Sequence, residues 1–214
     1  MSGPVPAKSL PQRVVLEGRY ARLEPIGPQH ADQLFAAAGP ERYTYLFTNK
    51  PASVADMAER LAAAAAQNDP LGFAVIDKAT GRVEGQQSLM RITPEHGVIE
   101  IGGINWGDAI ARTRVTTEAL YLHAGYVFDA LGYRRFEWKC NALNAPSRVA
   151  ALRFGFTYEG IFRQHMIVKG ENRDTAWFAM LDGDWPRIRA AYERWLDPSN
   201  FDSSGMQRSR LTLA

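Results

Sequence analysis

The sequence predicts a mixed α/β domain built around a largely antiparallel sheet. Short segments of alternating apolar residues are separated by turn residues, as at Ala79-Thr-Gly81-Arg, which is typical of hairpins. Other segments repeat apolar residues at spacings of three and four, which is typical of amphipathic helices. In the second half a helix lies between two strands, and such a βαβ unit places a parallel pair in the sheet. With 214 residues, 46% of them hydrophobic and 22% charged, the chain can fill one globular domain.

The first half of the chain is expected to form a strand pair, two helices and three strands. The strand pair turns at Gly18. The first helix begins near Pro28, because proline suits a first helical turn, and the second begins at Ser53, which forms a capping-box variant with Asp56. In chain order, the expected elements are the strand pair at 14–26, helices at 28–38 and 53–67, and strands at 73–76, 83–92 and 98–105.

The second half is expected to alternate helices with strands. Gly155 stands where a helix would end in a left-handed residue, and Asp184 with Pro186 suits the start of the last helix. The expected elements are helices at 116–131, 145–154 and 184–196, and strands at 135–140, 156–168 and 175–181. This assigns a single domain to residues 13–196, between a flexible tail at 1–12 and a loose polar tail at 197–214.

Composition argues against several classes of protein. A net charge of +2 is too small to indicate nucleic acid as a partner. The single cysteine, Cys140, is expected to be a small buried residue rather than a nucleophile, and one cysteine fits a reducing compartment. No segment approaches the roughly 20 apolar residues of a membrane span, and the first 13 residues lack the apolar run of a signal peptide. The protein is therefore predicted to be cytoplasmic, with no membrane partner. No Cys, His and Asp cluster has metal-ligand spacing, so no metal is predicted.

Two segments carry residues suited to chemistry. The first leads from Trp106 to Glu118, where a strand ends and a helix starts; a helix N-terminus binds anions, and Arg112 and Arg114 add guanidinium groups that suit phosphate. The alternative is that both arginines are solvated surface residues. The second is Asn144-Ala-Pro-Ser147, where Asn144 can cap a helix and, with Ser147, can also face a ligand.

The order of four short motifs resembles the GNAT superfamily of acyl-CoA-dependent N-acetyltransferases, in its RimJ/RimL-like branch. These motifs are Thr117-Glu118-Ala119, Asn144-x-x-Ser147, Gly155-Phe156 and Glu159-Gly160. The resemblance covers roughly residues 14–195. It implies a GNAT-like fold, in which a largely antiparallel central sheet splays in the middle, between the strands at 98–105 and 135–140, with helices on both faces.

The resemblance also implies acetyl-CoA as co-substrate, without a metal. The pantetheine arm would enter the splayed sheet and the pyrophosphate would lie on residues 111–116, with Ser147 as candidate general acid. The partner would be an amine acceptor, either a protein N-terminus or a small molecule, and a homodimer is compatible with the family. The residues implied in CoA binding are Ile104, Asn105, Trp106, Arg112, Thr113, Arg114, Val115, Thr116, Asn144 and Ser147.

The sequence departs from the family at two positions. Glycines of the phosphate loop are replaced by Arg112 and Arg114, so that arginine charge takes over part of the backbone site, or CoA binding is lost. A tyrosine that many members use as the acid is replaced by Ala151, which shifts that role to Ser147 or an ordered water.

Glu100 is the preferred candidate for the general base that takes the proton of the amine. It lies in an apolar strand, where partial desolvation would raise the pKa of its carboxyl, unless it faces solvent. His165 is the second candidate, with an ordinary strand histidine as the alternative. His30 and His123 are expected on helix surfaces. The backbone N–H groups of Gly102 to Asn105 are expected to polarise the thioester, although a β-bulge would also explain the two glycines.

Two functions remain open at this stage. One is an active N-acetyltransferase in which the amine attacks acetyl-CoA directly in a ternary complex. The other is a non-catalytic acyl-CoA-binding or interaction module on the same fold, which the replaced glycines and the missing tyrosine would favour.

Overall fold

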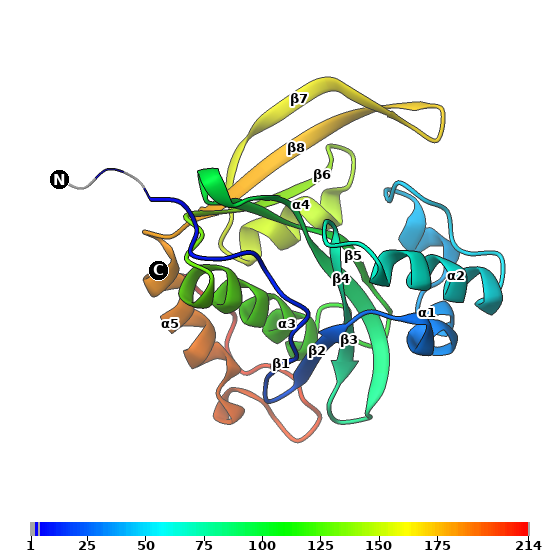
Figure 1. Cartoon of the computed structure of the whole chain (residues 1–214). Coiled ribbons are helices and arrows are strands. Elements are labelled where there is room, and N and C mark those ends of the chain that lie inside the picture. The colour runs from blue at the N-terminus through cyan, green and yellow to red at the C-terminus, as the bar shows by residue number, and fades with distance from the viewer. Residues whose placement is uncertain (1–2, 4, 214) are drawn as a thin grey trace.

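The computed structural model describes residue 3 and residues 5–213, and it consists of one eight-stranded sheet with helices on both faces (Figure 1). The strand order is β1-β2-β3-β4-β5-β6-β8-β7, in which only β5 and β6 run parallel. The strands are β1 (Leu16–Glu17), β2 (Ala21–Pro25), β3 (Leu71–Asp77), β4 (Arg82–Thr93), β5 (Val98–Trp106), β6 (Arg135–Asn141), β7 (Thr157–Val168) and β8 (Glu171–Leu181). The predicted fold class is confirmed.

Five α-helices lie close to the predicted positions. They are α1 (Ala31–Ala37), α2 (Val54–Ala65), α3 (Arg114–Gly125), α4 (Ala145–Arg153) and α5 (Trp185–Leu196). A π-helical segment at Tyr126–Ala130 continues α3. The Ser53 hydroxyl accepts a hydrogen bond from the Asp56 N–H, so the predicted cap of α2 is confirmed. Gly155 ends α4 with a φ of 96°, as its position predicts.

The two faces of the sheet are covered differently. On one face, called the α3 face, α3, α4 and α5 cover a core that includes Ile99, Ile101 and Trp138. On the other, called the α1–α2 face, the helices α1 and α2 pack over β3 and β4, around Ala74 and Ile76. Figure 1 shows β7 and β8 arching beyond the sheet, with their turn directed toward the loop between α1 and α2.

The sheet splays between β5 and β6. Their pairing runs from Val98↔Arg135 to Ile101↔Trp138 and then stops, while β6 stays paired with β8 to Asn141. Beyond Ile101, β5 is bonded only to β4, across a bulge where Gly103 has a φ of 59°. The expected splay is confirmed, and a bulge accounts for a glycine at 103.

Both chain ends pack more closely than a loose tail would. Near the start, the Ala7 N–H donates to the Pro94 carbonyl at 2.8 Å. Near the end, Phe201 is only 7% exposed and the Trp195 indole donates to the Ser209 carbonyl at 3.0 Å. Residues 197–213 therefore fold back on α5, and the expectation of a loose C-terminal segment is wrong. Met1, Ser2, Pro4 and Ala214 lie outside the described residues.

Two histidines expected on helix surfaces are buried. His30 bonds Glu24 at 2.8 Å, and His123 contacts Gln87 at 2.8 Å beneath the sheet. None of the helices in the described chain is both long and apolar enough to cross a membrane. Among residues 3 and 5–213, no group of three or more His, Cys, Asp or Glu side chains is placed to hold a metal ion.

Candidate active site

The start of α3 offers free backbone donors. Thr113 caps the helix by accepting from the Val115 N–H at 3.2 Å, while the N–H groups of Arg112, Arg114 and Thr116 have no hydrogen-bond partner among the described residues. Arg112 has a φ of 63°, so the left-handed backbone that a glycine would favour is present with an arginine in its place. Its side chain is exposed and has no ion pair in the described structure. Three donors and one free guanidinium suit an anion.

The Arg114 side chain, by contrast, packs against two aromatic rings. Its guanidinium lies 4.3 Å from the ring centre of Tyr20 and 5.1 Å from that of Phe201. The sequence placed Arg112 and Arg114 together as phosphate anchors, and the structure separates their side chains. Arg114 joins the C-terminal segment to the β1–β2 turn, and its N–H remains among the donors of the loop.

The free part of β5 divides its side chains between the two faces. Ile104 and Trp106 pack on the α3 face, where the Trp106 indole donates to Gln87 Oε1 at 3.0 Å and its ring lies 6.4 Å from that of Trp138. Asn105 is buried on the α1–α2 face beside Tyr43, and its Oδ1 has no partner among the described residues. The three residues assigned to CoA therefore do not share one face.

Asn144 and Ser147 lie at the start of α4, on the α3 face. Asn144 Oδ1 accepts from the Ser147 N–H at 3.2 Å, which is the expected cap. The Ser147 hydroxyl accepts from the Trp138 indole at 3.0 Å and also lies beside the Cys140 thiol. Burial raises the pKa of that thiol, as expected for a structural cysteine. Ser147 is thus held at the splay between the Trp138 indole and the Cys140 thiol.

Glu100 is 5% exposed, on the opposite face from Ser147. It precedes the last β5–β6 pair and forms an ion pair with Lys139, while Arg91 lies 3.4 Å from the same oxygen. Burial raises the pKa of Glu100 although Lys139 opposes the rise, and burial lowers the pKa of Lys139. Both shifts favour the neutral forms, and a raised pKa is the direction that a carboxylate base needs.

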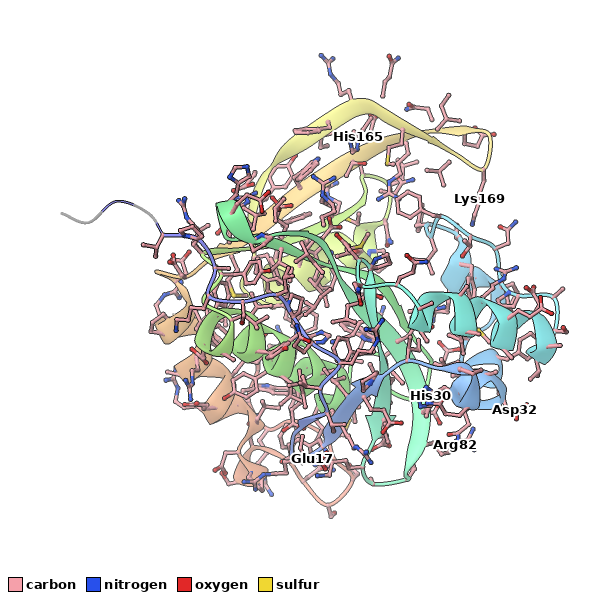
Figure 2. The ribbon with its side chains drawn as sticks, viewed as in Figure 1. Glu17, His30, Asp32, Arg82, His165 and Lys169 are labelled. Carbon is pink, nitrogen blue, oxygen red and sulfur yellow. The ribbon has the colours of Figure 1, made fainter. Side chains whose placement is uncertain are left out.

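His165 lies on β7 (Figure 2), and its contact with Trp177 places it on the face that Glu100 occupies. Its Nδ1 is 3.0 Å from the Thr175 hydroxyl, and its ring packs between Phe162 and Trp177, at 5.5 and 6.0 Å. The side chain is exposed. The structure therefore brings His165 to the same face as Glu100 without a contact between the two.

The sequence analysis missed three residues that lie on the α1–α2 face with Glu100. Lys139 forms the ion pair and packs 4.2 Å from the ring of Trp177, whose indole N–H has no partner among the described residues. Arg173 lies on the same face and comes from β8. Strand alternation could have identified them, because successive side chains of a strand point to opposite faces of the sheet. Since β6 and β8 pair directly, Lys139, Trp177 and Arg173 must share the face that Glu100 occupies.

Known proteins of the same kind resemble this chain over most of its length. Residues 21–157 match the family model described as an acetyltransferase (GNAT) domain. A GCN5-related N-acetyltransferase from Brucella melitensis is 55% identical over 97% of this chain and 96% of its own, with a TM-score of 0.94. A probable acetyltransferase of the GNAT family from Chromobacterium violaceum is 36% identical over 87% and 94% of the two chains, with a TM-score of 0.80.

A further relative is described as the uncharacterized N-acetyltransferase p20 of Bacillus licheniformis. It is 32% identical over 117 residues, which are 53% of this chain and 63% of that protein, so the match spans less than two thirds of its length. The family model alone covers more than half of the chain, and the splayed sheet and the donor-rich start of α3 lie within it. The chain therefore belongs to the GNAT family of acetyltransferases.

Proposed function

We propose that this protein transfers an acetyl group from acetyl-CoA to a primary amine, by direct attack of the amine in a ternary complex. The observation that carries the proposal is that the unpaired part of β5 lies next to the start of α3 in the chain. The unpaired edge of β5 from Gly102 to Trp106 leads directly to the unbonded N–H groups at the start of α3. A strand edge can bond an extended amide-containing arm, and the helix start can bind its phosphates.

The residues present fit CoA. Donors for the pyrophosphate are the N–H groups of Arg112, Arg114 and Thr116, and the exposed Arg112 side chain adds charge. Donors and acceptors for the pantetheine amides are the free backbone groups of β5. When bound, acetyl-CoA supplies an activated acyl group. Thr113 and Val115 contribute to the site as the cap of α3 rather than through free groups of their own.

Glu100 and Ser147 are assigned to opposite sides of the splay. Glu100, with Lys139, would take the proton of the attacking amine on the α1–α2 face. Ser147 would turn its O–H from the Cys140 thiol toward the leaving thiolate on the α3 face. The acceptor would therefore approach from the face that α1 and α2 leave uncovered. Membership of the RimJ/RimL-like branch, a cytoplasmic location and a homodimer remain predictions.

Calorimetric titration with CoA and a thiol-release assay with an amine panel test the proposal. Arg112→Ala should weaken CoA binding about tenfold, because one charged contact is lost. Glu100→Gln and Ser147→Ala should leave CoA affinity unchanged and lower kcat by about 100-fold, the usual scale for one acid or base. Glu59→Gln, an exposed change on α2, is the matched control. Tight CoA binding without thiol release on any amine would instead support a non-catalytic acyl-CoA-binding module.

A further inference from the structure

Arg173 is a buried cation without a counter-ion. It lies on β8 and is 6% exposed. Its Nε donates to the Thr175 hydroxyl at 3.3 Å, and its guanidinium lies 4.5 Å from the ring centre of Phe47. Within residues 3 and 5–213, no carboxylate forms an ion pair with it. The outer nitrogens of the guanidinium have no hydrogen-bond partner in this part of the chain.

The other buried charges on the same face are paired. Glu100 is paired with Lys139, and Glu137 with Arg135 at 2.8 Å. Leaving a buried charge unpaired costs free energy, and a guanidinium does not escape that cost by losing its proton near neutral pH. An anion that binds beside Phe47 would remove this free-energy cost. Burial lowers the pKa of Arg173, while Cys140 and Glu100 oppose the shift, so the Glu100 charge reaches this position.

Two neighbouring polar atoms on this face also lack partners. They are the Trp177 indole N–H and Asn105 Oδ1, both buried. Trp177 is four residues closer than Arg173 to the root of the splay, and Asn105 lies on the free part of β5. Arg173, Trp177 and Asn105 thus share with Glu100 the face from which an acceptor would approach. Buried polar groups without a partner are rare, and a polar ligand bound among them would supply the missing partners.

The surroundings favour a small ligand over a polypeptide. Lys169, at the turn of the β7–β8 hairpin, donates to the Tyr43 carbonyl at 2.7 Å. Figure 2 shows Lys169 directed from that turn toward the segment after α1. The contact of Arg173 with Phe47 joins the same two segments. The hairpin and the loop are therefore connected at two points, one of them at Arg173 itself.

We propose that Arg173 binds a carboxylate of the acceptor, and that the acceptor is a small amino-carboxylate with the amine directed to Glu100. A guanidinium stacked on an aromatic ring keeps its edge free, and that edge matches a carboxylate with two parallel hydrogen bonds. A positive group and a carboxylate base on one face complement the carboxylate and the amine of such a molecule. This inference rests on the proposed acetyl transfer.

Matched acceptor pairs test it. The thiol-release assay compares L-amino acids with their amides, which keep the amine and lose the carboxylate charge. Wild-type protein should use the free acids with the higher kcat/KM. Arg173→Gln should lower kcat/KM for the acids about 30-fold or more, mainly through KM, with little change for the amides. Arg173→Lys should retain part of the preference. Arg163→Gln, exposed on β7 of the same hairpin, should have no effect.

Two results would overturn the inference. One is equal loss of activity on acids and amides in Arg173→Gln; the other is better turnover of amides or of peptide amides by the wild type. Thermal shift with the same amino acids, with CoA present, separates this inference from the proposed function. Stabilisation of the wild type but not of Arg173→Gln, without thiol release, would support the carboxylate site and reject acetyl transfer. CoA affinity shows that both variants are folded.

Discussion

Glu118 shows how a residue of a family motif can serve the fold. Its carboxylate accepts backbone hydrogen bonds from Arg19 at 2.9 Å, Tyr20 at 2.5 Å and Ala21 at 2.6 Å. A buried carboxylate that bonds several N–H groups holds the β1–β2 turn against α3. Its presence in Thr117-Glu118-Ala119 therefore says little about the ligand, and more about how the start of α3 is kept in place.

We expect Glu118→Gln to destabilise the protein by about 2–3 kcal/mol. The amide has only one acceptor oxygen, and its NH₂ group would face N–H donors that have no other partner. Urea denaturation measures the change, with Glu59→Gln on the exposed side of α2 as control. A loss equal to that of the control would show that the turn does not depend on the carboxylate.

His123 gives the stability a specific pH dependence. The residue is 0% exposed, and burial lowers the pKa of its imidazole from 6.5 to about 3. Between these values the unfolded chain binds a proton that the folded chain does not. The free energy of unfolding should therefore fall as pH decreases through this window, by about 1.4 kcal/mol per unit from this group. Above pH 6.5 the contribution is complete.

Urea denaturation at several pH values from 4 to 8 measures this slope. His123→Gln cannot take up the proton, so its curve should be flatter than that of the wild type below pH 6.5. His96→Gln, exposed in the turn before β5, should keep the wild-type slope. Parallel curves for wild type and His123→Gln would contradict the assignment.

At the residue level, the sequence predicted helix caps and candidate site residues better than it predicted the contacts of those residues. Asn144 and Ser53 cap helices as predicted, because capping depends on residues three positions away. The ion pair of Glu100 with Lys139 joins strands that are distant in sequence, and the stacking of Arg114 on Phe201 depends on how the chain end folds. Such contacts depend on register and chain path, which local patterns do not specify.

At the scale of elements, hydrophobic periodicity was sufficient from β1 to α5. It failed for residues 197–213, whose polar composition predicted a loose segment. The segment is held by a few contacts rather than by a repeating pattern: Phe201 packs 5.1 Å from the ring of Trp195 and 5.6 Å from that of Tyr20, and forms a β-bridge with Gln207. One aromatic residue among polar ones gives no periodic signal.

Phe201→Ala should therefore destabilise the whole domain, by about 3 kcal/mol or more. It would leave a cavity between α5 and the β1–β2 turn and remove one of the two rings on Arg114. Calorimetry measures the shift in Tm. Met206→Ala lies in the same segment but is 65% exposed, and it should change Tm by little. Equal effects of the two substitutions would mean that the segment is not part of the folded unit.

At the scale of the whole molecule, the candidate site residues are distributed over both faces of the sheet. Ser147 and the start of α3 lie on the α3 face, and Glu100, Lys139 and Arg173 lie on the other. The two sets of residues approach each other through the sheet where β5 and β6 diverge. Under the proposed function, this arrangement would separate the approach of the two substrates, and the uncovered half of the α1–α2 face would select the acceptor.

The bond between Lys169 and the Tyr43 carbonyl should control access to that face. Lys169→Met removes the donor and keeps the length of the side chain, so the β7–β8 hairpin and the loop after α1 would separate more often. Because both segments are on the surface, stability should change by less than about 1 kcal/mol. Hydrogen exchange should become faster in residues 40–50, and KM for the acceptor should rise several-fold at unchanged CoA affinity. Arg163→Met, on the same hairpin, should change neither quantity. If exchange in residues 40–50 stays at the wild-type rate in Lys169→Met, the loop is held by its own contacts and not by the hairpin.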